Sequence, residues 1–284
     1  TGRGILLMIL AVALFTLMDA LAKGLVARYP APQIVWARFA GMLLIVLVIL
    51  RGRIPALLRT RHPGLHFLRA VSQFGATTSF FLALGHIGLA EATALSDVSP
   101  VLITLGAALF LGERLGPRRI LGVAAALAGA LIILRPGFGV FTPWALLPLF
   151  GACCYAANAL ITRWTGPRES VWTPMLYGAI FGTLLASLPL PALWVPLAAA
   201  DLPLFAAVGV LGTAAQLCLI RSFTLAEASV VAPFSYLGIV MAAAWGLLFF
   251  GEWPDAFDAL GALVIVLAGL YVWHRESLAA RETA

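Results

Sequence analysis

Three charged residues lie deep inside apolar stretches of the sequence: Asp19, Arg38 and Asp97. At a helical rise of about 1.5 Å per residue, each lies roughly 8–11 Å from the same end of its expected helix. Ionisable groups at such depth are costly unless they are paired. They therefore predict either a salt-bridge clamp that packs three helices or a site that binds a polar ligand or exchanges protons. Arg38 by itself is assigned a structural role.

Lys23 follows Asp19 by one helical turn. At this i,i+4 spacing the ammonium group is expected to reach back to the Asp19 carboxylate or to extend to the water interface. We therefore assign Lys23 a structural or gating role rather than a binding role.

Two prolines interrupt apolar runs, Pro100 and Pro233. Neither can donate a hydrogen bond to the carbonyl four residues earlier, at Ser96 and Ser229, so each predicts a kink. In one reading, freed carbonyls bind a cation such as an ammonium, and interrupted helix amino ends bind carboxylates. In the other, the prolines only shape helix packing.

Polar and aromatic residues near the middle of several runs predict a cavity shared by the two halves of the chain, or else hydrogen bonds between helices. Trp245 and Tyr236 are favoured, because an indole N–H or phenol O–H seeks a partner when buried. The candidate binding residues are Asp19, Gln73, Phe74, Thr77, Ser96, Asp97, Ser99, Tyr155, Asn158, Gln216, Ser235, Tyr236 and Trp245. The structural or gating candidates are Lys23, Arg38, Pro100 and Pro233.

The elements that must position these residues are transmembrane helices. Of 284 residues, 62% are hydrophobic and 11% charged, and the mean hydropathy is +1.03. A soluble domain cannot hide so much apolar surface, so lipid is the expected solvent. Continuous apolar runs, typical of helices rather than of β-barrels, predict an all-α transmembrane fold with ten spans: 4–26, 33–50, 65–86, 90–111, 118–134, 143–162, 172–190, 202–220, 228–250 and 257–273.

Basic residues are distributed unevenly between the connecting segments. Thirteen arginines lie in the segments that share a side with both termini, and two, Arg28 and Arg135, lie on the other side. The positive-inside rule therefore predicts cytoplasmic termini. The alternative, a cleaved signal peptide at the first run, is weakened by Asp19 just before the supposed cleavage site.

The sequence contains a diverged repeat. Ala90-Glu91-Ala92 recurs as Ala226-Glu227-Ala228, and Gly112-Glu113 recurs as Gly251-Glu252. Two units follow, 1–137 and 138–284, each with five helices. Because five is odd, the second unit must enter the membrane inverted, an architecture common in secondary transporters. The four glutamates are expected to stabilise helix starts or turns, with no part in transport.

The doubled pattern, together with Trp36-Ala37-Arg38-Phe39, resembles the EamA-type permeases of the drug/metabolite transporter superfamily, and among them the aromatic amino acid exporters. The resemblance covers nearly the whole chain and implies ten helices, alternating access and the bacterial cytoplasmic membrane. We expect an exporter of aromatic or other neutral amino acids. The alternative is an exporter of cationic drugs or other small metabolites.

Other classes of function lack their motifs. No nucleotide-binding P-loop, zinc-protease motif or nucleophile elbow occurs, so no enzyme, cofactor or metal is expected. A channel would need a repeated filter or a ring of like charges. The expected partners are a small amino-acid-like substrate and membrane lipid, with no nucleic acid, and the chain is expected to be a monomer.

Overall fold

The computed structural model describes residues 2–60, 62–111, 117–135, 142–165, 172–225 and 232–282, and in these ranges the regular elements are all helices. The long ones are α1 (Gly2–Val26), α2 (Ala31–Leu50), α4 (Pro63–Leu84), α7 (Pro117–Leu134), α8 (Leu146–Thr165), α9 (Trp172–Ser187), α11 (Leu202–Leu225) and α14 (Ala256–Glu282). Short connecting helices are η1 (Arg51–Arg53), α3 (Ile54–Leu57), η2 (Pro143–Ala145), α10 (Leu190–Leu193) and η3 (Ala199–Asp201). These bounds confirm the predicted all-α fold.

The fourth and ninth expected spans are interrupted. The fourth consists of α5 (Leu89–Ser96) and α6 (Ser99–Leu111), separated by Asp97 and Val98. The ninth enters through the 3-10 segment η4 (Ala232–Tyr236) and continues as α13 (Leu237–Phe250). Pro100 begins α6 and Pro233 lies in η4, as the missing proline N–H requires, so the predicted interruptions are confirmed. Ser229 and the side chain of Pro233 lie outside the part described.

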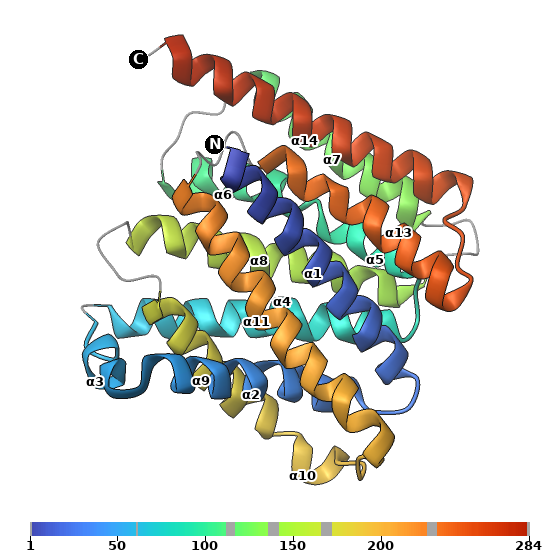
Figure 1. Cartoon of the computed structure of the whole chain (residues 1–284). Helices are drawn as coiled ribbons and strands as arrows, with labels where there is room; N and C mark the ends of the chain where they lie inside the picture. The colour runs from blue at the N-terminus through green and yellow to red at the C-terminus, as the bar shows by residue number, and fades with distance from the viewer. Residues whose placement is uncertain are drawn as a thin grey trace.

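The helices pack in a pattern that is preserved when the two halves are exchanged. α1 packs on α11 as α8 packs on α4, α2 packs on α11 as α9 packs on α4, and α13 packs on α1 as α6 packs on α8. The pairs α2–α9 and α7–α14 join equivalent elements of the two halves, and α5 packs on α13 across them. Figure 1 shows α14 alongside α7 and both termini toward the same side of the helix assembly. This pattern is what a duplicated five-helix unit produces.

Glycines allow two of these helix pairs to approach until their backbones touch. A Cβ atom on Gly41 of α2 would lie 2.7 Å from the Cα of Gly209 on α11. A Cβ atom on Gly261 of α14 would lie 2.6 Å from the carbonyl oxygen of Gly129 on α7. In a membrane, the hydrophobic effect does not drive helices together, because lipid tails are as apolar as the side chains. Small residues at helix crossings let the backbones approach closely and gain packing contacts instead.

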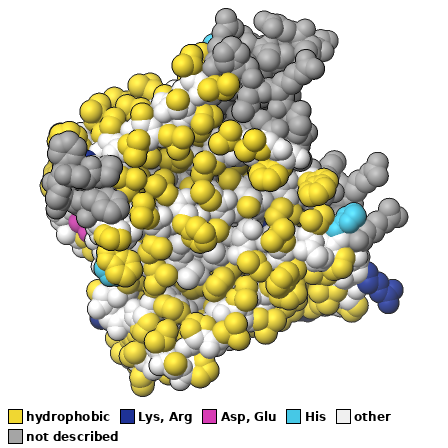
Figure 2. Space-filling view, turned by 180° about the vertical axis from the view of Figure 1, so that it is seen from behind, with side chains coloured by type: hydrophobic (Ala, Val, Ile, Leu, Met, Phe, Trp, Pro, Cys, Tyr) yellow, Lys and Arg dark blue, Asp and Glu magenta, His cyan; other side chains and the backbone are white. Residues whose placement is uncertain are grey.

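The outer surface of the assembly is apolar. Leucine and valine side chains on spanning helices are largely exposed, for example Leu6 at 67% and Val240 at 66%, and Figure 2 shows hydrophobic side chains across one whole face. Within the described ranges, four stretches are long and apolar enough to span a bilayer: Gly2–Val26, Ala31–Arg53, Pro143–Thr162 and Ala199–Ser222. The chain is a multi-pass membrane protein.

Candidate functional site

The end of the helix assembly opposite to both termini, here called the distal end, holds a cavity of about 680 Å³. It lies where α1, α4, α7 and α13 end and where α5 and α14 begin. Its charged lining residues are Lys23, Glu91, Arg135, Glu252, Asp255 and Asp258. Four acids against two bases make the cavity mouth acidic, which favours the approach of cations.

Lys23 is bound at the rim of this cavity. Its Nζ lies 2.7 Å from Oε1 of Glu252 and donates to the carbonyl oxygen of Ile87 at 2.6 Å. The other Glu252 oxygen accepts from the backbone N–H of Leu89, the first residue of α5, at 3.1 Å. The prediction that Lys23 reaches Asp19 or extends freely to the interface is wrong, because Glu252 on the following half supplies a nearer partner. These contacts join α1, α5 and the end of α13.

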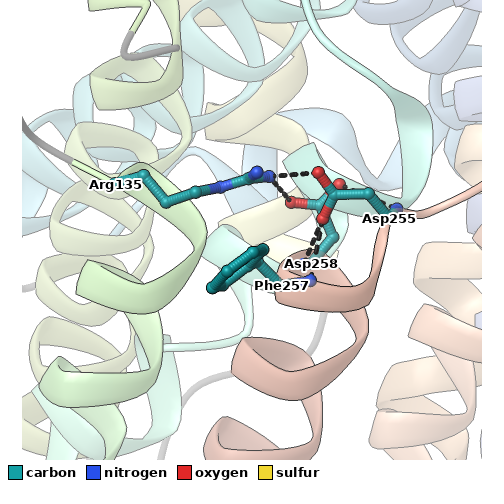
Figure 3. Close-up of polar contacts among 4 residues, drawn as sticks. All are labelled: Arg135, Asp255, Phe257 and Asp258. Atoms are coloured by element: carbon teal, nitrogen blue, oxygen red, sulfur yellow. Dashed lines mark hydrogen bonds and ion pairs between the residues drawn. The ribbon is translucent and has the colours of Figure 1, made fainter. Parts of the chain in front are cut away.

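A second ionic contact joins α7 to α14. Arg135 lies 2.5 Å from Asp255 and 3.1 Å from Asp258, with its guanidinium over the ring of Phe257 (Figure 3). Partial burial raises the pKa of the Asp255 carboxyl, but the backbone N–H of Asp258 and the Arg135 guanidinium outweigh it, so the pKa lies below its ordinary value. The hydrogen bond to Asp255 likewise raises the pKa of Arg135.

A third ionic contact joins the segment after α1 to η3. Arg28 lies 2.7 Å from Oδ1 of Asp201, and the hydroxyl of Tyr29 donates to Oδ2 at 2.8 Å. We call the three sets, Lys23–Glu252, Arg135–Asp255/Asp258 and Arg28–Asp201, the distal ion pairs. Each joins the segment before one helix to a segment far away in sequence, so together they hold the distal end.

Charged residues nearer the middle of the membrane are arranged differently. Asp19 on α1 and Arg38 on α2 interact electrostatically, but no ion pair forms between them. Arg38 instead donates to the hydroxyl of Thr77 on α4 at 3.1 Å. Its guanidinium also lies 5.8–5.9 Å from the ring centroids of Phe15, Phe39 and Phe81. The predicted clamp of direct salt bridges between Asp19, Arg38 and Asp97 is therefore absent from the described residues.

Asp97 occupies the interruption between α5 and α6. Its Oδ2 atom is buried and has no hydrogen-bond partner among the residues described. Asp97 acts electrostatically on the hydroxyls of Tyr155 on α8 and Tyr236 at the end of η4. We call Asp19, Arg38, Thr77 and Asp97 the mid-membrane polar set.

The two tyrosines beside Asp97 are held differently. Tyr236 is buried, and its ring lies so close to α14 that a Cβ atom on Gly269 would overlap it. Tyr155 is 48% exposed. Both residues were predicted to line a cavity, and both act on Asp97, which lies in the first half, from elements of the second half.

Aromatic residues lie beside the mid-membrane polar set. The indole N–H of Trp245 on α13 donates to the hydroxyl of Thr16 on α1 at 3.2 Å, and the indole stacks on Phe249. The expectation that Trp245 has a polar partner is confirmed. Phe74 packs beside Phe39, with ring centroids 6.0 Å apart.

A further polar contact lies toward the end that carries the termini. Asn158 on α8 donates to the backbone carbonyl of Arg69 on α4 at 3.0 Å, and its amide oxygen lies 3.5 Å from Nε of Arg69. Sequence analysis selected Asn158 but missed Arg69. The signal was present, because Arg69 is a buried charge within the run 65–86.

Four remaining candidates show no side-chain hydrogen bond to the described residues: Gln73, Ser96, Ser99 and Gln216. Gln73 packs against α9, where its amide oxygen lies 3.0 Å from the position of a Cβ atom on Gly178. Ser235 lies in η4 and has an interaction of its own. Glu91 lies in the first turn of α5 as predicted, whereas Glu113 and Glu227 fall outside the described residues.

The polar groups thus form a series along the helices: the distal ion pairs, the mid-membrane polar set, Trp245 with Thr16, and Arg69 with Asn158. The series draws on both halves of the chain. Such a series of polar groups within a bundle otherwise exposed to lipid is suited to conduct a polar solute rather than to catalyse a reaction.

Known proteins with the same organisation are membrane transporters. The chain is 34% identical to the pseudopaline exporter of Pseudomonas aeruginosa, over 93% of this chain and 94% of the exporter. It is 33% identical to the riboflavin transporter of Rhizobium johnstonii, over 99% and 94%. It is 26% identical to the S-adenosylmethionine uptake transporter of Rickettsia prowazekii, over 96% and 93%. These relatives do not support the expected likeness to aromatic amino acid exporters.

A solved crystal structure has the same fold, with a TM-score of 0.68 at 20% identity, covering 100% of this chain and 99% of the other. The EamA-like transporter family matches the chain twice, over residues 2–135 and 142–273, one match for each half. The chain therefore belongs to the EamA-like transporter family and is a secondary transporter of small metabolites.

Proposed function

We propose that this transporter exports a small metabolite that carries a cationic group, by alternating access between two inverted five-helix halves. The observation that carries the proposal is the state of Asp19 and Asp97. Both acids lie inside the bundle, and neither forms an ion pair with a described residue. An unpaired acid at this depth is costly to keep unless a cation binds there during function.

The surroundings of the two acids suit an organic cation rather than a metal ion. Phe15 and Trp245 contribute aromatic rings near the same helices, and aromatic faces attract organic cations. Among the described residues, no cluster of three or more histidine, cysteine or acidic side chains is placed to hold a metal. The acidic distal cavity would raise the local concentration of a cation at that end.

The relatives support a small metabolite without naming it. The pseudopaline exporter, the riboflavin transporter and the S-adenosylmethionine uptake transporter carry different cargoes at 26–34% identity to this chain. Substrate preference within such a family depends on a few cavity residues rather than on the fold. We propose export, rather than uptake, by analogy with the pseudopaline exporter.

Export of neutral or aromatic amino acids is a second, narrower candidate. It is favoured by Asp19 and Arg38, which are opposite charges at one level of the membrane that do not pair directly with each other. A zwitterion could bridge them, with its ammonium on Asp19 and its carboxylate on Arg38. The rings of Phe15 and Phe74 would then contact the amino acid side chain.

The proposed setting is the bacterial cytoplasmic membrane, with both termini in the cytoplasm and a single chain as the working unit. The thirteen arginines on the side of the termini support this orientation. The proposed repeat units are 1–137 and 138–284. Reporter fusions at Thr1 and Ala284 should both report the cytoplasm, and two different answers would overturn the inverted repeat.

Transport by the purified chain in liposomes tests the cargo class. Labelled S-adenosylmethionine and tetraethylammonium represent cations, phenylalanine represents neutral amino acids, and riboflavin represents uncharged metabolites. We expect the cations to be transported and Asp19→Asn to reduce their transport, while Thr183→Val, which removes a hydroxyl bonded within α9, preserves it. Transport of riboflavin or phenylalanine alone would contradict the proposal, and phenylalanine alone would establish the second candidate.

A further inference from the structure

Among the described acidic residues, Asp97 is the one that has a buried carboxyl oxygen, Oδ2, without a hydrogen-bond partner. Asp201 is also buried, but it binds Arg28 and Tyr29. Asp19 faces the nearby positive charge of Arg38. The Asp97 carboxyl therefore has neither a fixed cation nor a donor to stabilise a negative charge.

The backbone around Asp97 explains why no helix partner compensates. Its N–H bonds the carbonyl of Thr93, closing α5, and the N–H groups of Val101 and Leu102 both bond the carbonyl of Val98. The amides of Val101 and Leu102 are thus bonded to Val98, and Pro100 has no N–H, so none of these three residues donates to the Asp97 side chain. An ionised carboxylate in such a place is strongly disfavoured.

The titratable groups on the elements packed against α5 and α6 supply no positive charge that acts on the Asp97 carboxyl. α5 and α6 pack against α1, α4, α7, α8, α13 and α14. Tyr155 and Tyr236 are the groups that interact with Asp97, and both are neutral phenols at physiological pH. The other described titratable side chains on these elements are not among the charges that act on Asp97: Asp19, Lys23, His66, Arg69, Glu91, Cys153, Cys154, Asp258, Tyr271 and His274.

We propose that Asp97 is a proton–cation exchange site, which holds a proton in the conformation described here and releases it when the cationic group of the cargo binds. The step breaks the O–H bond of the carboxyl, passes the proton to water, and leaves a carboxylate that pairs with the cargo cation. When the cargo leaves on the other side of the membrane, the carboxylate takes a proton from that side. One proton thus moves against one monovalent cation, with no net charge transfer.

The position of Asp97 fits an exchange that alternates between the two membrane faces. It lies at the join of α5 with α6, and α5 packs on α13 of the other half. Six residues earlier, about 9 Å along the helix, Glu91 lines the distal cavity. Tyr155 and Tyr236 approach Asp97 from the second half, so a relative movement of the halves would change its surroundings. The cationic cargo of this exchange site rests on the proposed function, whereas the proton on Asp97 does not depend on it.

The proton can be tested without any cargo. Infrared difference spectra of the full chain in lipid nanodiscs, recorded during a pH titration, should contain a band of a protonated carboxyl at neutral pH. Asp97→Asn should remove this band, and Asp255→Asn should retain it. A band that survives in Asp97→Asn, or disappears instead in Asp19→Asn, would overturn the assignment. Monodisperse elution of each variant, and return of the band in Asp97→Glu, show that the loss is not misfolding.

The exchange is tested in liposomes with labelled tetraethylammonium and S-adenosylmethionine. One-for-one exchange predicts about tenfold accumulation for each unit of pH difference across the membrane. In Asp97→Asn, the pH difference should have no effect on accumulation, while Thr183→Val, which removes a hydroxyl bonded within α9, should behave as the unaltered chain does. Transport that ignores the pH difference in the unaltered chain would overturn the exchange and leave the proposed function standing. Absence of cation transport would overturn the proposed function and, with it, the cargo half of the exchange, while the infrared band still decides whether Asp97 holds a proton.

Discussion

At the distal end, every charged group that joins helices has a partner of opposite sign, whereas in the middle of the membrane the charges are left apart. Lys23 is 10% exposed and bonded to Glu252, and Arg135 binds Asp255 and Asp258. Asp19 and Asp97 form no ion pair with the described residues. The paired charges hold a conformation, while the unpaired ones remain available to a solute. Helix packing alone does not require unpaired charges in the middle of the membrane, because apolar residues at these positions would pack the helices at a lower cost.

The largest expected effect comes from removing a charge of the mid-membrane polar set. Asp19→Asn should reduce transport of a cationic probe about tenfold or more, because a contact to a charged group is worth about 1.5–3 kcal/mol. Stability should change little or rise, since no ion pair is lost. Initial rates in liposomes and the melting temperature of the purified chain measure the two. A large fall in melting temperature with unchanged transport would show that Asp19 is structural.

The next largest effect should come from the distal ion pairs, and here we expect a loss of stability. Glu252→Gln leaves Lys23 buried without a counter-charge, and we expect a loss of about 2–3 kcal/mol of stability, less than for a fully buried pair because Glu252 is 34% exposed. The amide of Gln can still accept from Leu89. The double variant Lys23→Met/Glu252→Met should recover most of the loss in a thermal unfolding assay. A single variant as stable as the unaltered chain would remove the contrast between the two regions.

A smaller effect is expected at an uncharged contact between the two halves, where Trp245 on α13 donates to Thr16 on α1. Thr16→Val keeps the shape of the side chain but leaves the indole N–H without its acceptor, at a cost of about 1–2 kcal/mol. Thermal unfolding measures this cost, with Thr213→Val as the matched control, because the Thr213 hydroxyl bonds only within its own helix. Equal losses in the two variants would show that the indole contact contributes nothing of its own.

The smallest effect should be the pH dependence of the Arg135–Asp255 pair. The pKa of Asp255 is lower in the folded chain than its ordinary value. Its contribution to stability is therefore complete above the ordinary pKa of about 4 and is lost as the pH falls through the lower, folded value. Because Asp255 is half exposed, solvent screening should keep it below about 1 kcal/mol. Melting temperatures between pH 7 and pH 3 should fall slightly less in Asp255→Asn, and an identical fall would show that the pair is neutral.

The helices and their interruptions were predictable because their causes are local. An apolar run such as 4–26 must cross lipid as a helix, since only a helix satisfies its own backbone there. Pro100 cannot continue the helix bonds of α5, and the break at Asp97 follows. The doubled Gly-Glu pattern predicted the two halves for the same reason, as similar sequence yields a similar unit.

The partners of the charges were not predictable, because they come from distant parts of the chain. Lys23 was expected to reach Asp19, its neighbour on the helix, but it binds Glu252, 229 residues later. Arg69 was overlooked although its burial follows from its position in an apolar run. Glu252 was assigned to a turn because nothing in its own segment indicates that Lys23 and Leu89 lie beside it.

From its sequence alone, this protein is determined to be a duplicated bundle of membrane-spanning helices with a few costly charges inside. Hydropathy, proline and glycine act over one or two helical turns, so these features need no knowledge of the neighbours. Which charges neutralise one another is decided only when the halves pack, because an ion pair depends on distances of a few ångströms between helices. That packing gave Lys23 a partner and left the Oδ2 atom of Asp97 without one among the residues that the structure describes.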